Sequence, residues 1–398
     1  MHCNRSGFKV LLASIAAISW LNACGPANTF VSATPAADDT SAPILPTRTL
    51  PPPDVPTITP SPAATLTPTS EAATSYYTAG VQAYGQGDYS TALLNFTQAL
   101  QFDPKNALIY MSRAATYLAQ KDFDGAAADY TQAIELDPDN VAAYVSRGEA
   151  YAGLEQFELA LEDLDHAVAL SPNESSVYVN RGRIVQASGD LQQAIDDFTQ
   201  ALTIDPNYAP AYYYRALAYA ADKPPDQISV DLRAINDLSA VIALQPENID
   251  AYLARAKAYF DGSDVDHALA DYDAALEIDP ENVAVYIQRG HLNDVRRDFA
   301  AALNDLSQAL KIDPQSAEAF YNRGLIYAEQ AQYTQAVVDF NAAIQIDPEY
   351  ALAYFRRGLA QEKRGNRTAA LADLRKALSL AQNAEDKALI QAELDRMK

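Results

Sequence analysis

The sequence predicts an all-α protein built as a stack of helical pairs. Prolines recur at a nearly fixed spacing, with six intervals of 34 residues and one of 40: Pro104, Pro138, Pro172, Pro206, Pro246, Pro280, Pro314 and Pro348. A period of this length is typical of repeat proteins, in which each repeat packs on its neighbours. Within each period, alanines and larger apolar residues recur every three to four positions in two stretches, which indicates two amphipathic helices. Neither helix can bury its apolar side alone, so the repeats must stack.

The repeat of residues 141–174 shows the pattern clearly. Its first helix is predicted over about 141–153 and its second over about 158–170. Proline lacks an amide proton and disfavours a helical residue before it, so Pro172 ends the second helix. The small residues Gly148, Ala160 and Ala167 lie where two helices must approach closely.

The repeated positions resemble the tetratricopeptide repeat family over residues 73–382. Counting each repeat from 1, the family's aromatic residue at position 4 is matched by Tyr76, Tyr110, Tyr144, Tyr178, Tyr212, Tyr252, Tyr286, Phe320 and Tyr354. Its small residue at position 8 is matched by Gly80, Ala114, Gly148, Gly182, Ala216, Ala256, Gly290, Gly324 and Gly358. Its alanine at position 20 is matched by Ala92, Ala126, Ala160, Ala194, Ala234, Ala268, Ala302, Ala336 and Ala370. The resemblance implies a right-handed superhelical solenoid of about nine helix-turn-helix repeats.

The two ends of the array and its fifth repeat depart from the pattern. Gln382 replaces the proline of the ninth repeat, and residues 383–398 are predicted to form an amphipathic capping helix with a polar outer side. In the fifth repeat, six extra residues fall within 220–226 and lengthen the turn between its helices. Such an insertion is either a surface loop or a partner contact.

Arginine at position 7 and aspartate at position 23 recur together from the second repeat onward. Examples are Arg147 with Asp163, Arg181 with Asp197, and Arg323 with Asp339. The first repeat lacks both, because Ala79 and Asn95 stand in their places. This joint loss favours pairing across the two helices of one repeat, while pairing with a neighbouring repeat stays open. A half-buried guanidinium needs a carboxylate partner, so we interpret this arginine–aspartate ladder as structural.

The N-terminus is predicted to be a lipoprotein signal peptide, residues 1–23. Arg5 and Lys9 precede a short apolar stretch, residues 10–21, which is too short to span a bilayer. The sequence Leu-Asn-Ala-Cys that ends at Cys24 resembles the bacterial lipobox, which implies lipid on Cys24 as the membrane anchor. The expected location is the cell envelope, on the outer face of the cytoplasmic membrane or on the outer membrane. Plain secretion and an uncleaved anchor are the alternatives.

Residues 24–72 are predicted to be a disordered linker before the array of residues 73–382. Eleven of the chain's 22 prolines lie in this stretch, among threonine, serine and alanine. Proline-rich chain of this kind favours an extended, solvated backbone. The linker would hold the array away from the membrane as a spacer, with glycosylation or threading through a cell wall as alternatives.

Composition and motifs argue against several classes of function. The 52 acidic and 29 basic residues give a net charge of −23, which disfavours nucleic acid as a partner. This charge indicates either a solvated surface or a preference for a basic ligand. The histidines of the array, His166, His267 and His291, lie in different repeats, and the sequence contains no metal-ligand, nucleophile or phosphate-loop motif. We therefore expect no enzyme activity, no cofactor and no metal.

The resemblance places candidate binding residues on the first helix of each repeat, where the family's positions 2, 5, 9, 12 and 13 face a groove. The candidates are Tyr77, Val81, Tyr84, Met111, Arg183, Tyr213, Leu217, Lys257, His291, Tyr321 and Leu325. Position 5 is apolar in every repeat, which favours packing between helices over ligand contact. Position 9 varies in chemistry, as a specific ligand surface would. Because no position 5 holds lysine or arginine, the family's capture of a chaperone's C-terminal carboxylate is not carried over.

Two function hypotheses follow. The first is a non-enzymatic scaffold on the outer face of the cell envelope, which binds a peptide segment or protein partner in the groove for envelope or surface-complex assembly. The alternative is a carbohydrate-associated lipoprotein of polysaccharide export. Groove aromatics near Asn180, Gln288 and Asn322 would favour the carbohydrate, and a continuous apolar channel would favour the peptide. A spacer that binds nothing is a third possibility.

Overall fold

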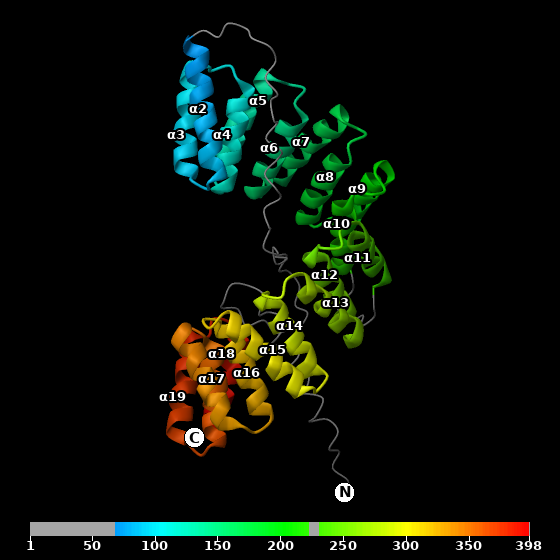
Figure 1. The fold of residues 1–398 in the computed structure, drawn as a ribbon. Helices are drawn as coiled ribbons and strands as arrows, with labels where there is room; N and C mark the ends of the chain where they lie inside the picture. The colour runs from blue at the N-terminus through cyan, green and yellow to red at the C-terminus, as the bar shows by residue number, and fades with distance from the viewer. Residues whose placement is uncertain (1–67, 223–230, 398) are drawn as a thin grey trace. The chain divides into compact units, whose positions relative to one another are not determined.

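The computed structural model describes residues 68–222 and 231–397, and all regular structure in these residues is helical (Figure 1). The helices follow one another as nine pairs and a final single helix: α2 (Pro68–Gly85) and α3 (Tyr89–Phe102), α4 (Ala107–Ala119) and α5 (Phe123–Leu136), α6 (Val141–Gly153) and α7 (Phe157–Leu170), α8 (Ser175–Ala187) and α9 (Leu191–Ile204), α10 (Ala209–Ala221) and α11 (Leu232–Leu244), α12 (Ile249–Asp261) and α13 (Val265–Ile278), α14 (Val283–Val295) and α15 (Phe299–Ile312), α16 (Ala317–Glu329) and α17 (Tyr333–Ile346), α18 (Ala351–Lys363) and α19 (Arg367–Leu380), then α20 (Ala384–Arg396). The predicted all-α class and the stack of paired helices are confirmed.

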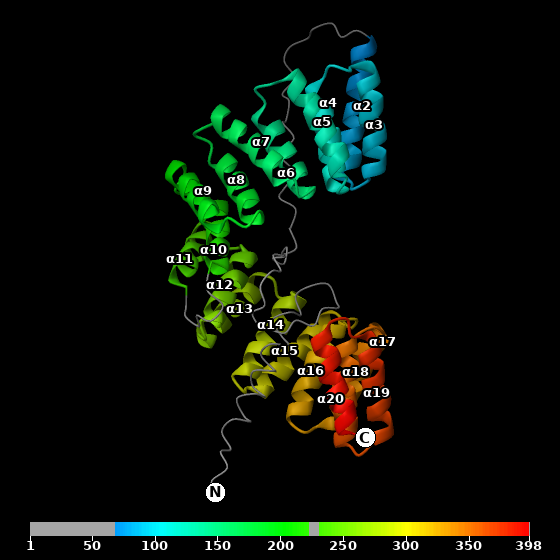
Figure 2. The same cartoon turned by 180° about the vertical axis from the view of Figure 1, so that it is seen from behind.

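The described residues divide into two compact bodies. We call residues 68–251 the N-terminal half-array and residues 252–397 the C-terminal half-array. Within each half-array, the second helix of a repeat packs on the first helix of the next, as α5 does on α6 and α15 on α16. First helices of successive repeats also touch one another, from α2 through α4, α6 and α8 to α10, and from α14 through α16 to α18. Figures 1 and 2 show these neighbours from opposite sides.

Side-chain caps and tight turns set the helix boundaries. Asp122 accepts a hydrogen bond from the Gly125 amide at the start of α5, and Asn140 accepts one from the Ala143 amide at the start of α6. The turn between the helices of a repeat contains a residue with positive φ, which is glycine in three repeats and another residue in five: Gly87, Lys121, Glu155, Gly189, Ser263, Arg297, Ala331 and Gly365. The left-handed region costs a residue with a side chain roughly 1–2 kcal/mol, so packing must hold these turns in place.

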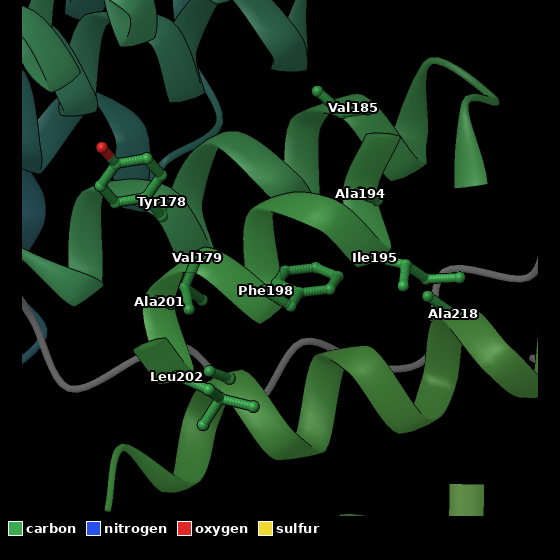
Figure 3. Packing of buried hydrophobic residues seen from close by; sticks show 10 residues of the cluster. Tyr178, Val179, Val185, Ala194, Ile195, Phe198, Ala201, Leu202 and Ala218 are labelled. Carbon is green, nitrogen blue, oxygen red and sulfur yellow. The ribbon is translucent and has the colours of Figure 1, made fainter. Parts of the chain in front are cut away.

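Close approach of the two helices of a repeat depends on the small residue at position 8. In the fourth repeat, a Cβ atom added to Gly182 would lie 2.6 Å from Cε1 of Phe198. Phe198 is fully buried with Val179 and Ile195 in a cluster contributed by α8, α9 and α10 (Figure 3). The glycine therefore makes room for the aromatic ring on which the next repeat packs.

The helix boundaries agree closely with the predicted ones, with one shift. α6 spans the predicted residues, and α7 begins at Phe157, one residue before the predicted start. α2 begins at Pro68 and so includes residues that the sequence interpretation assigned to the linker. Proline suits the first helical position because its fixed φ fits the helix and no amide partner is needed there.

Three predictions fall wholly or largely outside the described residues. These are the signal peptide of residues 1–23, lipidation of Cys24, and the linker up to residue 67. Most of the inserted turn of the fifth repeat also lies in the gap at residues 223–230. Within the part of the chain that is described, no helix is both long and apolar enough to cross a bilayer.

Candidate partner-binding surface

The arginine–aspartate ladder joins the two helices of every repeat from the second to the ninth, as predicted. In the third repeat, Nε and Nη2 of Arg147 donate to the two carboxylate oxygens of Asp163 at 2.8 and 2.7 Å. The same pairing occurs in Arg113–Asp129, Arg181–Asp197, Arg215–Asp237, Arg255–Asp271, Arg289–Asp305, Arg323–Asp339 and Arg357–Asp373. The bond to Asp163 raises the pKa of Arg147 above its ordinary value. The aspartates are nearly buried and each is satisfied by a bidentate partner.

The same arginine also reaches the preceding repeat. Nη1 of Arg147 donates to the Thr131 hydroxyl at 3.1 Å. Equivalent bonds, one repeat apart, join Arg113 to Thr97, Arg181 to Asp165, Arg215 to Thr199, Arg289 to Asp273, Arg323 to Ser307, and Arg357 to Asn341. Both alternatives left open by the sequence therefore occur together. The guanidinium holds three helices at once and fixes how one repeat docks on the next.

The aromatic residue at position 4 covers the guanidinium. Arg147 lies 5.7 Å from the ring centre of Tyr144, and Arg357 lies 5.2 Å from that of Tyr354. Rings at the same position cover Arg113, Arg181, Arg215, Arg255, Arg289 and Arg323. A cation over an aromatic face is favourable and excludes water from the ion pair. The ladder residues are thus fully used by the fold and leave no group free for a partner.

The remaining candidates lie on the first helices, whose shared surface we call the first-helix face. It comprises α2, α4, α6, α8 and α10 in the N-terminal half-array, and α14, α16 and α18 in the C-terminal one. Eight candidates on these helices are half-buried: Tyr77, Val81, Tyr84, Met111, Arg183, Tyr213, Leu217 and Leu325. Lys257, on α12, is exposed and pairs with Asp261 at 2.6 Å.

The apolar side chains at position 5 serve packing. The ring of Tyr77 lies 5.9 Å from that of Phe96, on the second helix of its own repeat. Val179, Ile287 and Phe355 are buried. The apolar residues at position 5 are therefore better explained by packing between helices than by contact with a ligand.

Two predicted binding residues, Tyr321 and His291, are buried, and their assignment to the surface is wrong. Tyr321 is 5% exposed, with its ring 5.9 Å from Phe340 and 5.0 Å from Tyr350. His291 is 6% exposed and meets the ring of Phe260 edge-on at 5.8 Å. Burial also lowers the pKa of His291 to about 4, so its imidazole is neutral.

Comparisons with known proteins agree with this architecture. Sequence profiles described as TPR repeat match residues 82–121, 116–155 and 182–222. Profiles described as tetratricopeptide repeat match residues 141–174, 232–283, 287–355 and 351–383. Together these matches cover well over half of the chain.

The chain belongs to the tetratricopeptide repeat family. Solved structures similar to it include MamA, 28% identical, covering 45% of this chain and 94% of that one with a TM-score of 0.37. A tetratricopeptide repeat protein from Parabacteroides merdae is 20% identical, covering 65% and 98% with a TM-score of 0.48. Yeast Tom70 is 16% identical, covering 82% and 96% with a TM-score of 0.37. No curated protein matches the sequence.

The sequence interpretation missed a group of polar side chains on the tetratricopeptide repeats of the C-terminal half-array. Glu318 stands at position 2 of α16, Asp294 at position 12 of α14 and Arg356 at position 6 of α18. Burial raises the pKa of Glu318 to about 7, and burial, followed by the charge of Glu329, raises that of Asp294 to about 6. Glu318 and Asp294 could have been found in the sequence, because each places a carboxyl at a position that is apolar or small in most repeats.

These carboxyls are not part of a cluster of candidate metal ligands. Among the residues that the structure describes, no three histidine, cysteine, aspartate or glutamate side chains converge as metal ligands. The ring of His166 is tilted against that of Tyr144 with ring centres 4.3 Å apart, and Nδ1 of His267 lies 2.7 Å from Asp264, the N-cap of α13. The geometry of these tetratricopeptide repeats is that of a surface for recognition.

Proposed function

We propose that the protein is a non-enzymatic tetratricopeptide repeat scaffold, exported and anchored to the cell envelope by lipid on Cys24. Its first-helix face binds a peptide segment or a protein partner, for assembly of an envelope or surface complex. The linker of residues 24–67 gives the array reach from the membrane.

The observation that supports this proposal most is that the ladder residues and the residues of the first-helix face have different roles in each repeat. The ladder satisfies its charges within the fold and keeps the first helices of successive repeats in contact. On the first-helix face, by contrast, the partly exposed side chains differ from repeat to repeat, as Val81, Arg183 and Leu217 do at position 9. Within one half-array, a row of helices that presents varied chemistry suits recognition of an extended partner.

Carbohydrate binding receives less support. Stacking on a sugar ring requires an open aromatic face, and the rings of Tyr77 and Tyr321 pack on Phe96 and Phe340 instead. Asn322, which would hydrogen-bond a sugar hydroxyl, is 1% exposed.

Site-specific photocrosslinking in intact cells tests the binding surface. A photoreactive phenylalanine analogue at Leu217, on α10, should form a discrete adduct with one partner. The control position is Leu94, which is 61% exposed on the second helix α3 of the same half-array. Equal labelling at both positions, or none at Leu217, would contradict binding on the first-helix face.

Substitution of Cys24 tests the anchor. We expect the chain with Cys24→Ser to lose its membrane association and the mass of its lipid. Retention of the wild-type chain in the soluble fraction would overturn the anchoring part of the proposal and leave the binding part untouched.

A further inference from the structure

In the part of the chain that the structure describes, the buried polar atoms without a hydrogen bond lie on three neighbouring first helices of the C-terminal half-array. Within the described residues, the buried side-chain atoms without a hydrogen bond are Asp294 Oδ1 on α14, Tyr321 OH and Asn322 Nδ2 on α16, and Arg356 Nε on α18. Native proteins pair nearly all such atoms, because leaving one unpaired costs about 1–3 kcal/mol. Tyr321 and Arg356 also interact with each other, and Asn322 is 1% exposed, which leaves the partly exposed Asp294 carboxyl for a ligand.

Glu318 adds an unpaired carboxyl at the first turn of α16. It is partly buried, and it makes no hydrogen bond or salt bridge with any described residue. Burial is the cause of the raised pKa of Glu318. The carboxylate charge of Glu318 in turn helps to raise the pKa of the neighbouring Tyr350. A cation supplied from outside would stabilise the charged form of Glu318.

Asp294 presents a second carboxyl near the opposite end of α16. It interacts with Glu329, in the last turn of α16, which is paired with Arg297 at 3.2 Å. Arg297 lowers the pKa of Asp294 less than burial and Glu329 raise it. Burial and Glu329 together therefore disfavour the charged form of Asp294, which an added cation would stabilise.

The two carboxyls are separated by about the length of α16. Glu318 and Glu329 are eleven residues apart, so a rise of 1.5 Å per residue gives roughly 16 Å. An extended chain advances about 3.3 Å per residue, so five to six residues span this distance.

We propose that the first-helix face of α14, α16 and α18 binds an extended peptide segment carrying two basic side chains five to six residues apart. One cation meets Glu318 and the other meets Asp294. The inference rests on the proposed function and specifies its ligand, and the chain's net charge of −23 favours approach of a basic segment.

Selection from a random twelve-residue peptide library on the full chain tests the proposal. Enriched peptides would be labelled with fluorescein and titrated by fluorescence anisotropy against the wild type and the double variant E318Q/D294N. The matched control is E158Q/E162Q, which removes two exposed carboxylates from α7 and changes the net charge equally. Circular dichroism melting would establish that both variants are folded.

We expect the enriched peptides to carry lysine or arginine at the stated spacing. They should bind E318Q/D294N at least ten-fold more weakly, and the control less than two-fold more weakly. Moving the second basic residue next to the first should also weaken binding. Peptides that are not basic, or that bind both variants equally, would overturn this inference and leave the proposed function standing. Enrichment of no peptide would count against both.

Discussion

Replacing Asp163 by alanine tests the arginine–aspartate ladder in an internal repeat. The substitution leaves Arg147, whose side chain is 16% exposed, without the bidentate carboxylate that it now has. Removing one partner of a buried ion pair costs about 3–5 kcal/mol. Because Arg147 keeps its bond to Thr131 and its contact with Tyr144, we expect the lower end, about 3 kcal/mol.

The matched control lies on the same helix. Asp165 accepts a hydrogen bond from Arg181 at 2.8 Å, but its side chain is 67% exposed. Exposed ion pairs contribute about 0–1 kcal/mol, so Asp165→Ala should have little effect. The double variant R147A/D163A should be roughly 2 kcal/mol less destabilised than the sum of the two single variants, because the single changes leave a charge unpaired.

Hydrogen exchange measured by mass spectrometry is the suitable assay, because long repeat arrays do not unfold as one two-state unit. A loss of 3 kcal/mol corresponds to roughly 100-fold faster exchange through local opening. The effect should concentrate in α6 and α7 and decline toward α2. The reasoning would be refuted by a change under 1 kcal/mol in D163A, by equal effects of D163A and D165A, or by additive single variants.

Two further predictions concern packing and pH. Gly182→Ala should lower the free energy of unfolding by about 1–2 kcal/mol, because the added Cβ would lie 2.6 Å from Phe198. At Gly148 the nearest atom would be 3.1 Å away, so alanine there should destabilise the fold less. A larger fall in melting temperature for Gly148→Ala than for Gly182→Ala would contradict this reasoning. Burial raises the pKa of Glu318 from 4.5 to about 7, so its contribution to stability is full below pH 4.5 and is lost as pH rises through 7. Glu318→Gln should therefore flatten the fall in melting temperature between pH 5 and 8. If the melting temperature of this variant changes with pH as that of the wild type does, Glu318 is not the group responsible. His291 contributes in the opposite sense, because its pKa is lowered from 6.5 to about 4 and its stability is lost as pH falls through that range.

The ladder could be predicted from the sequence because its two members disappear together. Ala79 and Asn95 mark the one repeat without the pair, and Asn95 donates to the backbone carbonyl of Thr91 instead. The third contact of each arginine could not be found in this way. Its acceptor at position 25 is threonine, serine, aspartate or asparagine, as at Thr131 and Asp165, so no single residue type marks it.

The candidate surface was predicted less well, because a helical position fixes the side of the helix and not the depth of the side chain. His291 and Tyr321 lie at family positions that face a ligand, yet Phe260 and Tyr350 pack against them. Phe260 comes from the preceding repeat and Tyr350 from the end of the same repeat, so the depth of these side chains depends on neighbours that their own positions do not reveal. Glu318 is a carboxyl at a position that is apolar or small in most repeats, and a carboxyl without a basic neighbour carries a stronger chemical signal than an aromatic side chain does.

The arginines from Arg113 to Arg215 and from Arg289 to Arg357 bond forward to their own aspartate and backward to a hydroxyl, amide or carboxylate, so these seams share one bonding pattern. Thr97, Thr131 and Ser307 offer the same oxygen to whichever arginine follows sixteen residues later. Excision of 34 consecutive residues from the interior would therefore create a junction with the same spacing between the arginine and its acceptor. An array of this kind can be shortened or extended by whole cassettes, and its length can change in evolution or engineering without redesign of any junction.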